Sequence, residues 1–227
     1  MSSRVQWRPS PNHDERPMPV DILLLHYTGM TQASAALDRL CDPVARVSAH
    51  YLIEEDGTLW QLVDEERRAW HAGVSHWAGA TDINARSIGI ELQNPGHEFG
   101  YRAFPEPQMQ ALIGLARGIL RRHPIPAWRV IGHSDVAPTR KEDPGELFDW
   151  RRLADAGIGL WPMIDQKSAP DADWQTLLTA YGYDIADPAA ALVAFQRHFQ
   201  PDALGAPAGP ETRRILAALL KAAGRTA

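Results

Sequence analysis

The sequence predicts an α/β fold, in which a mixed central β-sheet is flanked by helices and followed by a small C-terminal three-helix bundle. Between residue 20 and residue 163, short apolar runs typical of strands alternate with helical patterns. Residues 49–53 and 58–63 flank Asp56-Gly57, a pair that favours a hairpin turn and therefore indicates an antiparallel strand pair. Three further helical patterns follow one another near the C-terminus. These observations distinguish a mixed-sheet domain from a helical tail.

The chain begins with an arm and then enters the sheet. Residues 1–19 contain four prolines and many polar groups, which indicates an arm lying on the surface. Residues 20–26 form an apolar run that ends near a Thr-Gly pair, as expected for a buried strand closed by a turn. Thr31 can cap a helix that runs through Leu40, and Pro43 prevents this helix from continuing far.

The middle of the chain completes the sheet and adds the longest helix. Residues 87–92 have the apolar, β-branched pattern of another strand. Residues 106–122 place Leu112 and Ala116 on one apolar face, as an amphipathic helix does. Residues 128–133 are predicted to form a further strand that runs into a loop. Because strands and helices alternate, we expect the helices to pack on the faces of the sheet.

The character of the chain changes after residue 164. Residues 165–172 are polar and contain proline, which indicates a linker. Apolar residues then recur at helical spacing in three segments that begin near Trp174, Leu192 and Ile215. The predicted organisation is therefore an arm at 1–19, a catalytic domain at 20–164, a linker at 165–172 and a three-helix bundle at 173–227.

Composition excludes several classes of protein. The chain has 23 Lys and Arg against 28 Asp and Glu, and its net charge of −5 argues against binding nucleic acid or anionic membranes by bulk electrostatics. The single cysteine, Cys41, excludes an intrachain disulfide and a cysteine-based structural zinc site. No run approaches the ~20 apolar residues that a membrane-spanning helix needs. A monomer with no transmembrane segment is expected.

The N-terminus bears on the compartment. No apolar run follows its positive charges, so it does not have the pattern of a secretory signal. This favours a cytoplasmic protein. A periplasmic or outer-membrane-associated location stays open in case a signal has been removed from the sequence.

Three side chains at the ends of apolar runs or in loops form a candidate metal site. They are His26, His133 and Asp143, each placed where an element gives way to a loop and a side chain can face a cleft. Two imidazoles and a carboxylate leave the fourth position of a tetrahedral zinc ion for water. Glu91 ends another strand and can serve as a base for that water, and Lys141 can stabilise an oxyanion by its charge.

Several motifs in one order carry a family resemblance. They are Leu25-His-Tyr-Thr-Gly29, Val47-Ser-Ala-His-Tyr-Leu-Ile53, Ala69-Trp-His-Ala-Gly-Val-Ser75, Ser87-Ile-Gly-Ile-Glu-Leu92 and Ile131-Gly-His-Ser-Asp-Val-Ala-Pro138 with Lys141-Glu-Asp-Pro-Gly145. Over roughly residues 20–163 the chain resembles the zinc-dependent N-acetylmuramoyl-L-alanine amidases of the amidase-2 family, which have the peptidoglycan-recognition-protein fold. The resemblance implies hydrolysis of the amide between N-acetylmuramic acid, or its 1,6-anhydro form, and L-alanine in peptidoglycan or muropeptides.

The resemblance also assigns roles to single residues. It implies that His26, His133 and Asp143 bind one Zn²⁺, that Glu91 is the catalytic acid and base, and that Lys141 steadies the tetrahedral intermediate. The alternative is a non-catalytic peptidoglycan-recognition protein on the same fold. Such relatives typically lack a metal ligand, whereas all three candidates are present here.

Three more residues are candidates for contact with substrate, each with an alternative left open. His71 either contacts substrate or organises its loop, and His50 either takes part in the site or is a buried, hydrogen-bonded imidazole. Trp70 either lines a sugar-binding groove or belongs to the core. The other five histidines have no such context and are taken as structural or solvated.

The tail has a shorter resemblance of its own. Residues 194–199 and 209–213 resemble the Phe-Gln and Glu-Thr signatures of the three-helix peptidoglycan-binding domain. The bundle therefore either binds glycan or packs on the catalytic domain. The sequence leaves open whether the substrate is a soluble anhydro-muropeptide or intact peptidoglycan.

Overall fold

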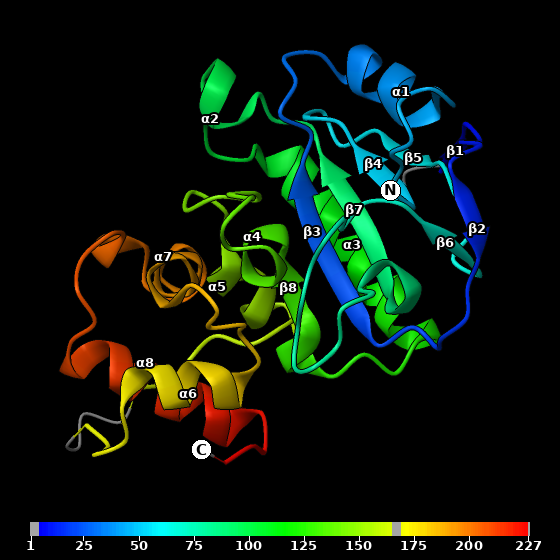
Figure 1. Cartoon of the computed structure of the whole chain (residues 1–227). Coiled ribbons are helices and arrows are strands. Elements are labelled where there is room, and N and C mark those ends of the chain that lie inside the picture. The colour runs from blue at the N-terminus through cyan, green and yellow to red at the C-terminus, as the bar shows by residue number, and fades with distance from the viewer. Residues whose placement is uncertain (1–4, 165–168, 227) are drawn as a thin grey trace.

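The computed structural model describes residues 5–164 and 169–226, and it contains the mixed sheet that the sequence predicts. Six strands are arranged in the order β1-β5-β4-β7-β3-β8 (Figure 1). Their bounds are Gln6–Trp7 (β1), Ile22–Tyr27 (β3), Tyr51–Ile53 (β4), Leu59–Gln61 (β5), Ser87–Leu92 (β7) and Val130–Gly132 (β8). The expected hairpin is the antiparallel pair β4 and β5, and the other neighbouring strands run parallel.

Alternation along β3 assigns its side chains to two layers. Leu23 and Leu25 point to one face, where they share a core with α3 (Glu106–Arg122), the long helix behind the sheet (Figure 1). Ile22 and Leu24 point to the other face, and His26 continues this second series. A smaller apolar cluster, which includes Leu52 of β4, holds α1 (Ala33–Cys41) against the second face of the sheet. His26, the candidate metal ligand on β3, therefore lies on the face opposite to the one that α3 covers.

The second face of the sheet is covered from the C-terminal side of the chain. The short helix α4 (His133–Val136) contacts both β3 and the C-terminal helices (Figure 1). The short helix α5 (Trp150–Asp155) packs by Trp150 and Leu153 into the apolar cluster of the first face, which α3 covers. The bundle consists of α6 (Trp174–Tyr181), α7 (Pro188–Phe199) and α8 (Pro210–Ala222).

Sheet and bundle share one apolar cluster. It joins Ile22, Leu24 and Trp77 to Tyr181 and Phe195 of the bundle. The bundle thus packs directly on the remainder of the chain. The division into domains at residues 164 and 173 stays a prediction, and residues 165–168 of the predicted linker lie outside the described residues.

Two N-terminal expectations need correction. The arm does not only lie on the surface, because β1 pairs with β5 and β2 (His13–Glu15) pairs with β6 (Arg67–Ala69). Buried Asn12 fastens this arm by donating to two backbone carbonyls, each at 2.8 Å. Thr31 is not the N-cap of the first helix as expected, because the helix starts at Ala33 and its N-cap residue is Gln32, which makes no side-chain capping bond.

The remaining elements are short. They are α2 (Gly96–Phe99) and the 3₁₀ segments η1 (Asn84–Arg86), η2 (Ala127–Arg129) and η3 (Pro201–Ala203). Among the described residues, no helix combines the length and apolar character that crossing a membrane requires.

Candidate active site

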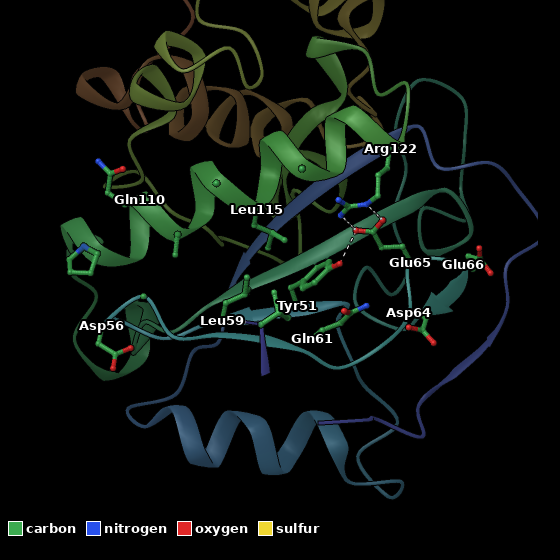
Figure 2. A pocket seen from close by; sticks show the side chains of 16 residues that line it. Tyr51, Asp56, Leu59, Gln61, Asp64, Glu65, Glu66, Gln110, Leu115 and Arg122 are labelled. Atoms are coloured by element: carbon green, nitrogen blue, oxygen red, sulfur yellow. Dashed lines mark hydrogen bonds and ion pairs between the residues drawn. The ribbon is translucent and has the colours of Figure 1, made fainter. Parts of the chain in front are cut away.

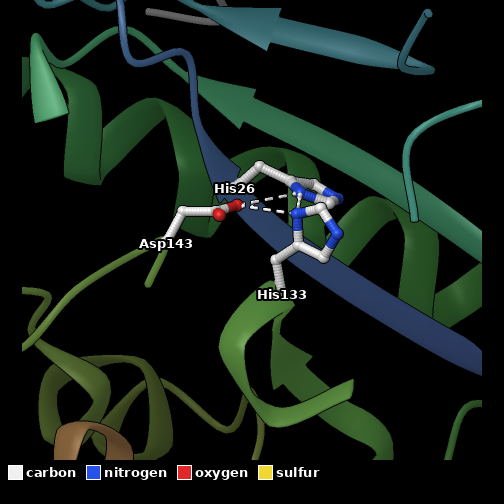
Figure 3. Close-up of side chains that lie close together, drawn as sticks. All are labelled: His26, His133 and Asp143. Carbon is white, nitrogen blue, oxygen red and sulfur yellow. Dashed lines mark hydrogen bonds and ion pairs between the residues drawn. The ribbon is translucent and has the colours of Figure 1, made fainter. Parts of the chain in front are cut away.

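The three candidate metal ligands meet at one point beside the sheet (Figure 3). The Nδ1 atoms of His26 and His133 are 2.9 Å apart, and Oδ2 of Asp143 lies 3.1 Å and 3.0 Å from them. All three residues are buried. Donors that each lie about 2.0–2.2 Å from one zinc ion can approach one another this closely. Two imidazoles and one carboxylate are also a donor set that zinc accepts, so the residues present fit such an ion.

Different elements hold the three ligands. His26 is part of β3, where its Cα pairs with that of Glu91 on β7. His133 follows β8 and opens α4, while Asp143 lies in the loop beyond α4. The Ser134 N–H donates to the Asp143 carbonyl at 2.9 Å and so joins these two ligands, which we call loop-borne because both lie beyond the end of β8. The sheet thus supplies one ligand and a carboxylate beside it, and the start of α4 and the loop beyond α4 supply the other two ligands.

Hydrogen bonds on the far side of each imidazole fix its tautomer. Nε2 of His133 lies 3.0 Å from the Ala72 carbonyl, which only accepts, so this nitrogen carries the proton. Nε2 of His26 lies 3.0 Å from Nδ1 of His71, and Nε2 of His71 lies 3.3 Å from the Ser87 hydroxyl. That hydroxyl donates to a carbonyl at 2.7 Å. In this series of hydrogen bonds, Nδ1 of His71 accepts from Nε2–H of His26. The Nδ1 atoms of both His26 and His133 are then unprotonated, and their lone pairs face Asp143.

The electrostatics of His26 and Asp143 favour the same protonation states. Burial, aided by the neighbouring His133, lowers the pKa of His26 to about 4 and keeps its ring neutral. Burial alone would raise the pKa of Asp143, but the adjacent imidazoles outweigh it and hold that pKa well below its usual range. Neutral imidazoles beside an ionised carboxylate are the forms that bind a metal ion.

Glu91 and Lys141 line a cavity of about 350 Å³ that opens onto the ligand group. Arg140 and α1 residues form other parts of its wall. The Oε2 atom of Glu91 is buried and has no hydrogen-bond partner among the described residues. Burial raises the pKa of the Glu91 carboxyl well above its usual value, and the charge of Asp143 adds to this. A carboxyl that has one buried, unpartnered oxygen and lines a cavity beside a metal-binding group can exchange protons with a bound molecule.

His71 lies behind His26 and also lines the cavity. Gly89 makes room for its ring, because a Cβ at this strand position would stand 2.5 Å from Nδ1 of His71. The geometry assigns His71 an orienting part towards His26, and direct contact with substrate stays a prediction.

His50 and Trp70 do not line this cavity. His50 is completely buried and its Nδ1 accepts from the Gly89 N–H at 3.0 Å. Burial lowers the pKa of His50 to about 3. Trp70 is half-buried and donates from Nε1 to Asp14 at 3.2 Å. The His50 contact matches the buried, hydrogen-bonded alternative left open by the sequence, whereas Trp70 is not among the core residues described. A role in substrate binding stays a prediction for each.

Sequence reasoning missed the residues that support the ligands. The Asn84 side chain accepts from the N–H groups of His71 and Ala72, and Asp135 accepts from the Gly132 N–H. Oδ2 of Asp135 also lies 2.7 Å from Nδ1 of His198 on α7. The Gly-His-Ser-Asp order carries a helix-capping signal that can place Asp135, but no local pattern links it to a residue so distant in the chain.

A larger hollow, of about 1040 Å³, lies elsewhere, between α3 and the β4–β5 hairpin (Figure 2). Tyr51 and Arg122 both donate to Glu65 there, and these side chains are drawn with their ion pair and hydrogen bonds in Figure 2. None of the candidate site residues lines it. The chemistry-bearing residues therefore belong to the smaller cavity.

Comparison with known proteins decides the family. The family model described as N-acetylmuramoyl-L-alanine amidase matches residues 16–146. The chain belongs to this amidase family. N-acetylmuramoyl-L-alanine amidase AmiD of Escherichia coli is 38% identical over 235 residues, which cover 91% of this chain and 84% of AmiD. The amidase AmpD of Haemophilus influenzae is 37% identical and covers 63% of this chain and 86% of its own length.

Solved structures of amidases share the fold. A complex of E. coli AmiD with anhydro-N-acetylmuramic acid-L-Ala-D-γ-Glu-L-Lys superposes with a TM-score of 0.81 at 36% identity, over 96% of this chain and 94% of AmiD. AmpDH3 from Pseudomonas aeruginosa gives a TM-score of 0.80 at 35% identity, over 94% and 95% of the two chains. The predicted mixed α/β fold of the family is confirmed.

Proposed function

We propose that this chain is a zinc-dependent amidase that cleaves the bond between the lactyl group of N-acetylmuramic acid, or of its 1,6-anhydro form, and L-alanine. The observation that carries the proposal is the buried group His26, His133 and Asp143, with Glu91 paired to His26 across two strands. Membership of the amidase family supports the reaction. The substrate named for the AmiD complex, an anhydro-muramyl tripeptide, supports the choice of molecule.

The three ligands would hold one zinc ion through two Nδ1 atoms and a carboxylate oxygen. When bound, such an ion polarises a carbonyl group and makes water acidic enough to lose a proton near neutral pH. His71 and the Ala72 carbonyl keep the two imidazoles in the tautomer that this requires. The chain therefore presents unprotonated Nδ1 atoms of His26 and His133 and a carboxylate oxygen of Asp143, already positioned for a metal ion.

Proton transfer falls to Glu91. In the ionised state its carboxylate takes a proton from the attacking water, and in the protonated state it gives that proton to the departing amine of L-alanine. Its unpartnered Oε2 and raised pKa suit both halves of this exchange, because no donor among the described residues occupies the lone pair that takes up the proton. Lys141, on the same cavity wall, stabilises the negative charge that develops on the carbonyl oxygen.

The activity is tested by incubating the full chain with an anhydro-muramyl tripeptide and measuring released peptide by mass spectrometry. We expect cleavage only at the lactyl–alanine amide, loss of cleavage after treatment with a chelator, and recovery with one equivalent of zinc. Binding of the tripeptide without cleavage by the zinc-loaded protein would instead identify a recognition protein.

The physiological substrate is addressed by a second digestion. Whole sacculi and soluble 1,6-anhydro-muropeptides are supplied side by side at matched concentrations of stem peptide. A recycling enzyme of the cytoplasm prefers the soluble muropeptide. Preference for sacculi would favour a wall-facing enzyme whose bundle binds glycan.

A further inference from the structure

We propose that the C-terminal end of α7 positions the two loop-borne metal ligands, with His198 acting on the loop of His133 and Arg197 on the loop of Asp143. The inference rests on the proposed metal site, and it gives the bundle a part in the active centre that is separate from any contact with the cell wall. His198 and Arg197 are positioning residues, because each acts through a neighbour of a ligand.

His198 acts through Asp135, the residue two positions after His133. Nδ1 of His198 lies 2.7 Å from Oδ2 of Asp135, and this oxygen also accepts from the Gly132 N–H at 2.7 Å. The other oxygen accepts from the Tyr183 hydroxyl at 2.6 Å. Asp135 is fully buried, so loss of these partners would not be compensated by water. The carboxylate therefore links the bundle to the backbone on both sides of His133.

The ring of His198 is itself held in place. It stacks on Trp150 with centroids 3.8 Å apart and an interplanar angle of 20°. It also stacks on Phe199, at 3.7 Å and 8°. Only 3% of the His198 side chain is exposed. A ring restrained in this way can fix the position of the carboxylate that it contacts.

Arg197 acts on the segment that contains Asp143. Its guanidinium is nearly buried, with Nε 3.4 Å from Glu146 and a terminal nitrogen 3.5 Å from Glu142, the residue before Asp143. From the other side, His97 lies 3.2 Å from Glu146. Residues 142–146 are thus held between α2 and α7.

The contacts of His198 and of Arg197 act on one structure, because the segments that carry His133 and Asp143 are joined to each other. The Ser134 N–H donates to the Asp143 carbonyl at 2.9 Å. A Cβ at Gly132 would stand 2.7 Å from Cδ of Pro144, so the residue before His133 also packs tightly against the proline that follows Asp143. Consecutive residues of one helix therefore restrain both loops, and a shift of α7 would move His133 and Asp143 relative to His26.

The variants for the test remove each contact and preserve shape. His198→Phe keeps the stacked ring and loses the donor, and His198→Asn keeps a donor close to the position of Nδ1. Arg197→Met keeps the aliphatic stem and loses the charge. The matched control is Gln196→Leu in the same helix. Gln196 is fully buried, but its hydrogen bonds go to Gly205 and Ala206 inside the bundle.

The measurement is the zinc dissociation constant of each full-length variant, from competition with a chromophoric chelator, together with the visible spectrum of the cobalt(II) form. We expect His198→Phe and Arg197→Met each to bind zinc about 10-fold more weakly, as losses of outer-shell support do. Their cobalt(II) bands shift, because the ligand geometry changes. His198→Asn recovers most of the affinity, and Gln196→Leu binds zinc as the original chain does while unfolding at a lower temperature.

Two results would overturn the inference. One is unchanged zinc affinity and cobalt(II) spectrum in both His198→Phe and Arg197→Met. The other is an equal loss in Gln196→Leu, which would make the effect one of bundle stability alone. If His198→Phe or Arg197→Met fails to fold while Gln196→Leu folds, the zinc affinity and cobalt(II) spectrum of the other variant and of His198→Asn decide the question. Failure of the unaltered chain to bind one zinc would instead contradict the proposed function.

Discussion

The two halves of the ligand group are held by different means. His26 belongs to β3, which is hydrogen-bonded along its length to β7 and in part to β8, so its backbone is fixed by the sheet. His133 and Asp143 lie at and beyond the end of β8, where side chains such as Asp135 and Arg197 restrain the loops. The sheet thus provides a rigid half and the loops provide a half that depends on partners distant in sequence. Metal binding and catalysis require the ligands of both halves to keep their relative positions.

The largest expected effect comes from removing a ligand of the loop-borne half. Asp143→Ala leaves two imidazoles with no carboxylate, so zinc content falls to a small fraction and activity falls on the order of 10³-fold or more. Metal analysis after dialysis and the rate of peptide release test this. An Asp143→Ala protein that keeps one tightly bound zinc would remove Asp143 from the ligand group.

The next largest effect separates chemistry from metal binding on the rigid half. Glu91→Gln preserves the shape of the side chain but cannot take a proton, so kcat falls about 10²–10⁴-fold. Zinc content and KM stay close to those of the original chain, because Glu91 is not a ligand. Full activity in a zinc-loaded Glu91→Gln protein contradicts the assigned proton transfer.

A smaller loss is expected for the charge on the cavity wall. Lys141→Met keeps the length of the side chain and lowers kcat on the order of 10²-fold, because one source of oxyanion stabilisation is lost. Lys141→Arg retains the charge and part of the rate. If Lys141→Met changes KM alone, Lys141 binds the ground state of the substrate and has no special part in the transition state.

The contact between His71 and His26 can be disturbed separately, by a substitution at Gly89. Gly89→Ala inserts a methyl group where the His71 ring lies, so His71 shifts and zinc binds about 10-fold more weakly. Gly114→Ala is the matched control, because a Cβ there meets nothing within 4 Å in the middle of α3. Chelator competition compares the two. Equal zinc affinity in both variants would show that His71 does not orient His26.

The smallest effect belongs to a region outside both halves. Burial alone would raise the pKa of Glu65, but hydrogen bonds from Arg122, His123 and Tyr51 outweigh it and lower this pKa to about 2. The stabilisation is therefore present above about pH 4.5 and is lost as the pH falls towards 2, and it amounts to about 1–3 kcal/mol. The difference in the free energy of unfolding between Glu65→Gln and the original chain, from urea unfolding, should be smaller at pH 3 than at pH 6. A difference of the same size at both pH values would contradict this origin, and zinc affinity at pH 7 should be the same in both proteins.

Much of the rigid half could be predicted from the sequence. Residues 87–92 and 106–122 coincide with β7 and α3, because apolar periodicity directly reports which face of an element is buried. The grouping of His26, His133 and Asp143 followed from their places at element ends together with the family motifs, and the structure brings all three together.

The supporting contacts could not be predicted in the same way. His198 had no context in the sequence and was taken as structural or solvated, yet it contacts Asp135 across 63 positions of the chain. Such a pairing depends on how the bundle packs on the sheet, and neither local propensity nor a short motif encodes that. The same holds for Asn12 and the strands of the N-terminal arm, which proline-rich composition alone describes as surface segments.

The most direct test of the proposed zinc site is anomalous X-ray diffraction at the zinc absorption edge, from crystals of the zinc-loaded full chain. The account predicts one strong peak bonded to Nδ1 of His26, Nδ1 of His133 and the carboxylate of Asp143, within reach of Glu91. A chain that crystallises without zinc at this position, or with zinc held by other residues, would contradict it.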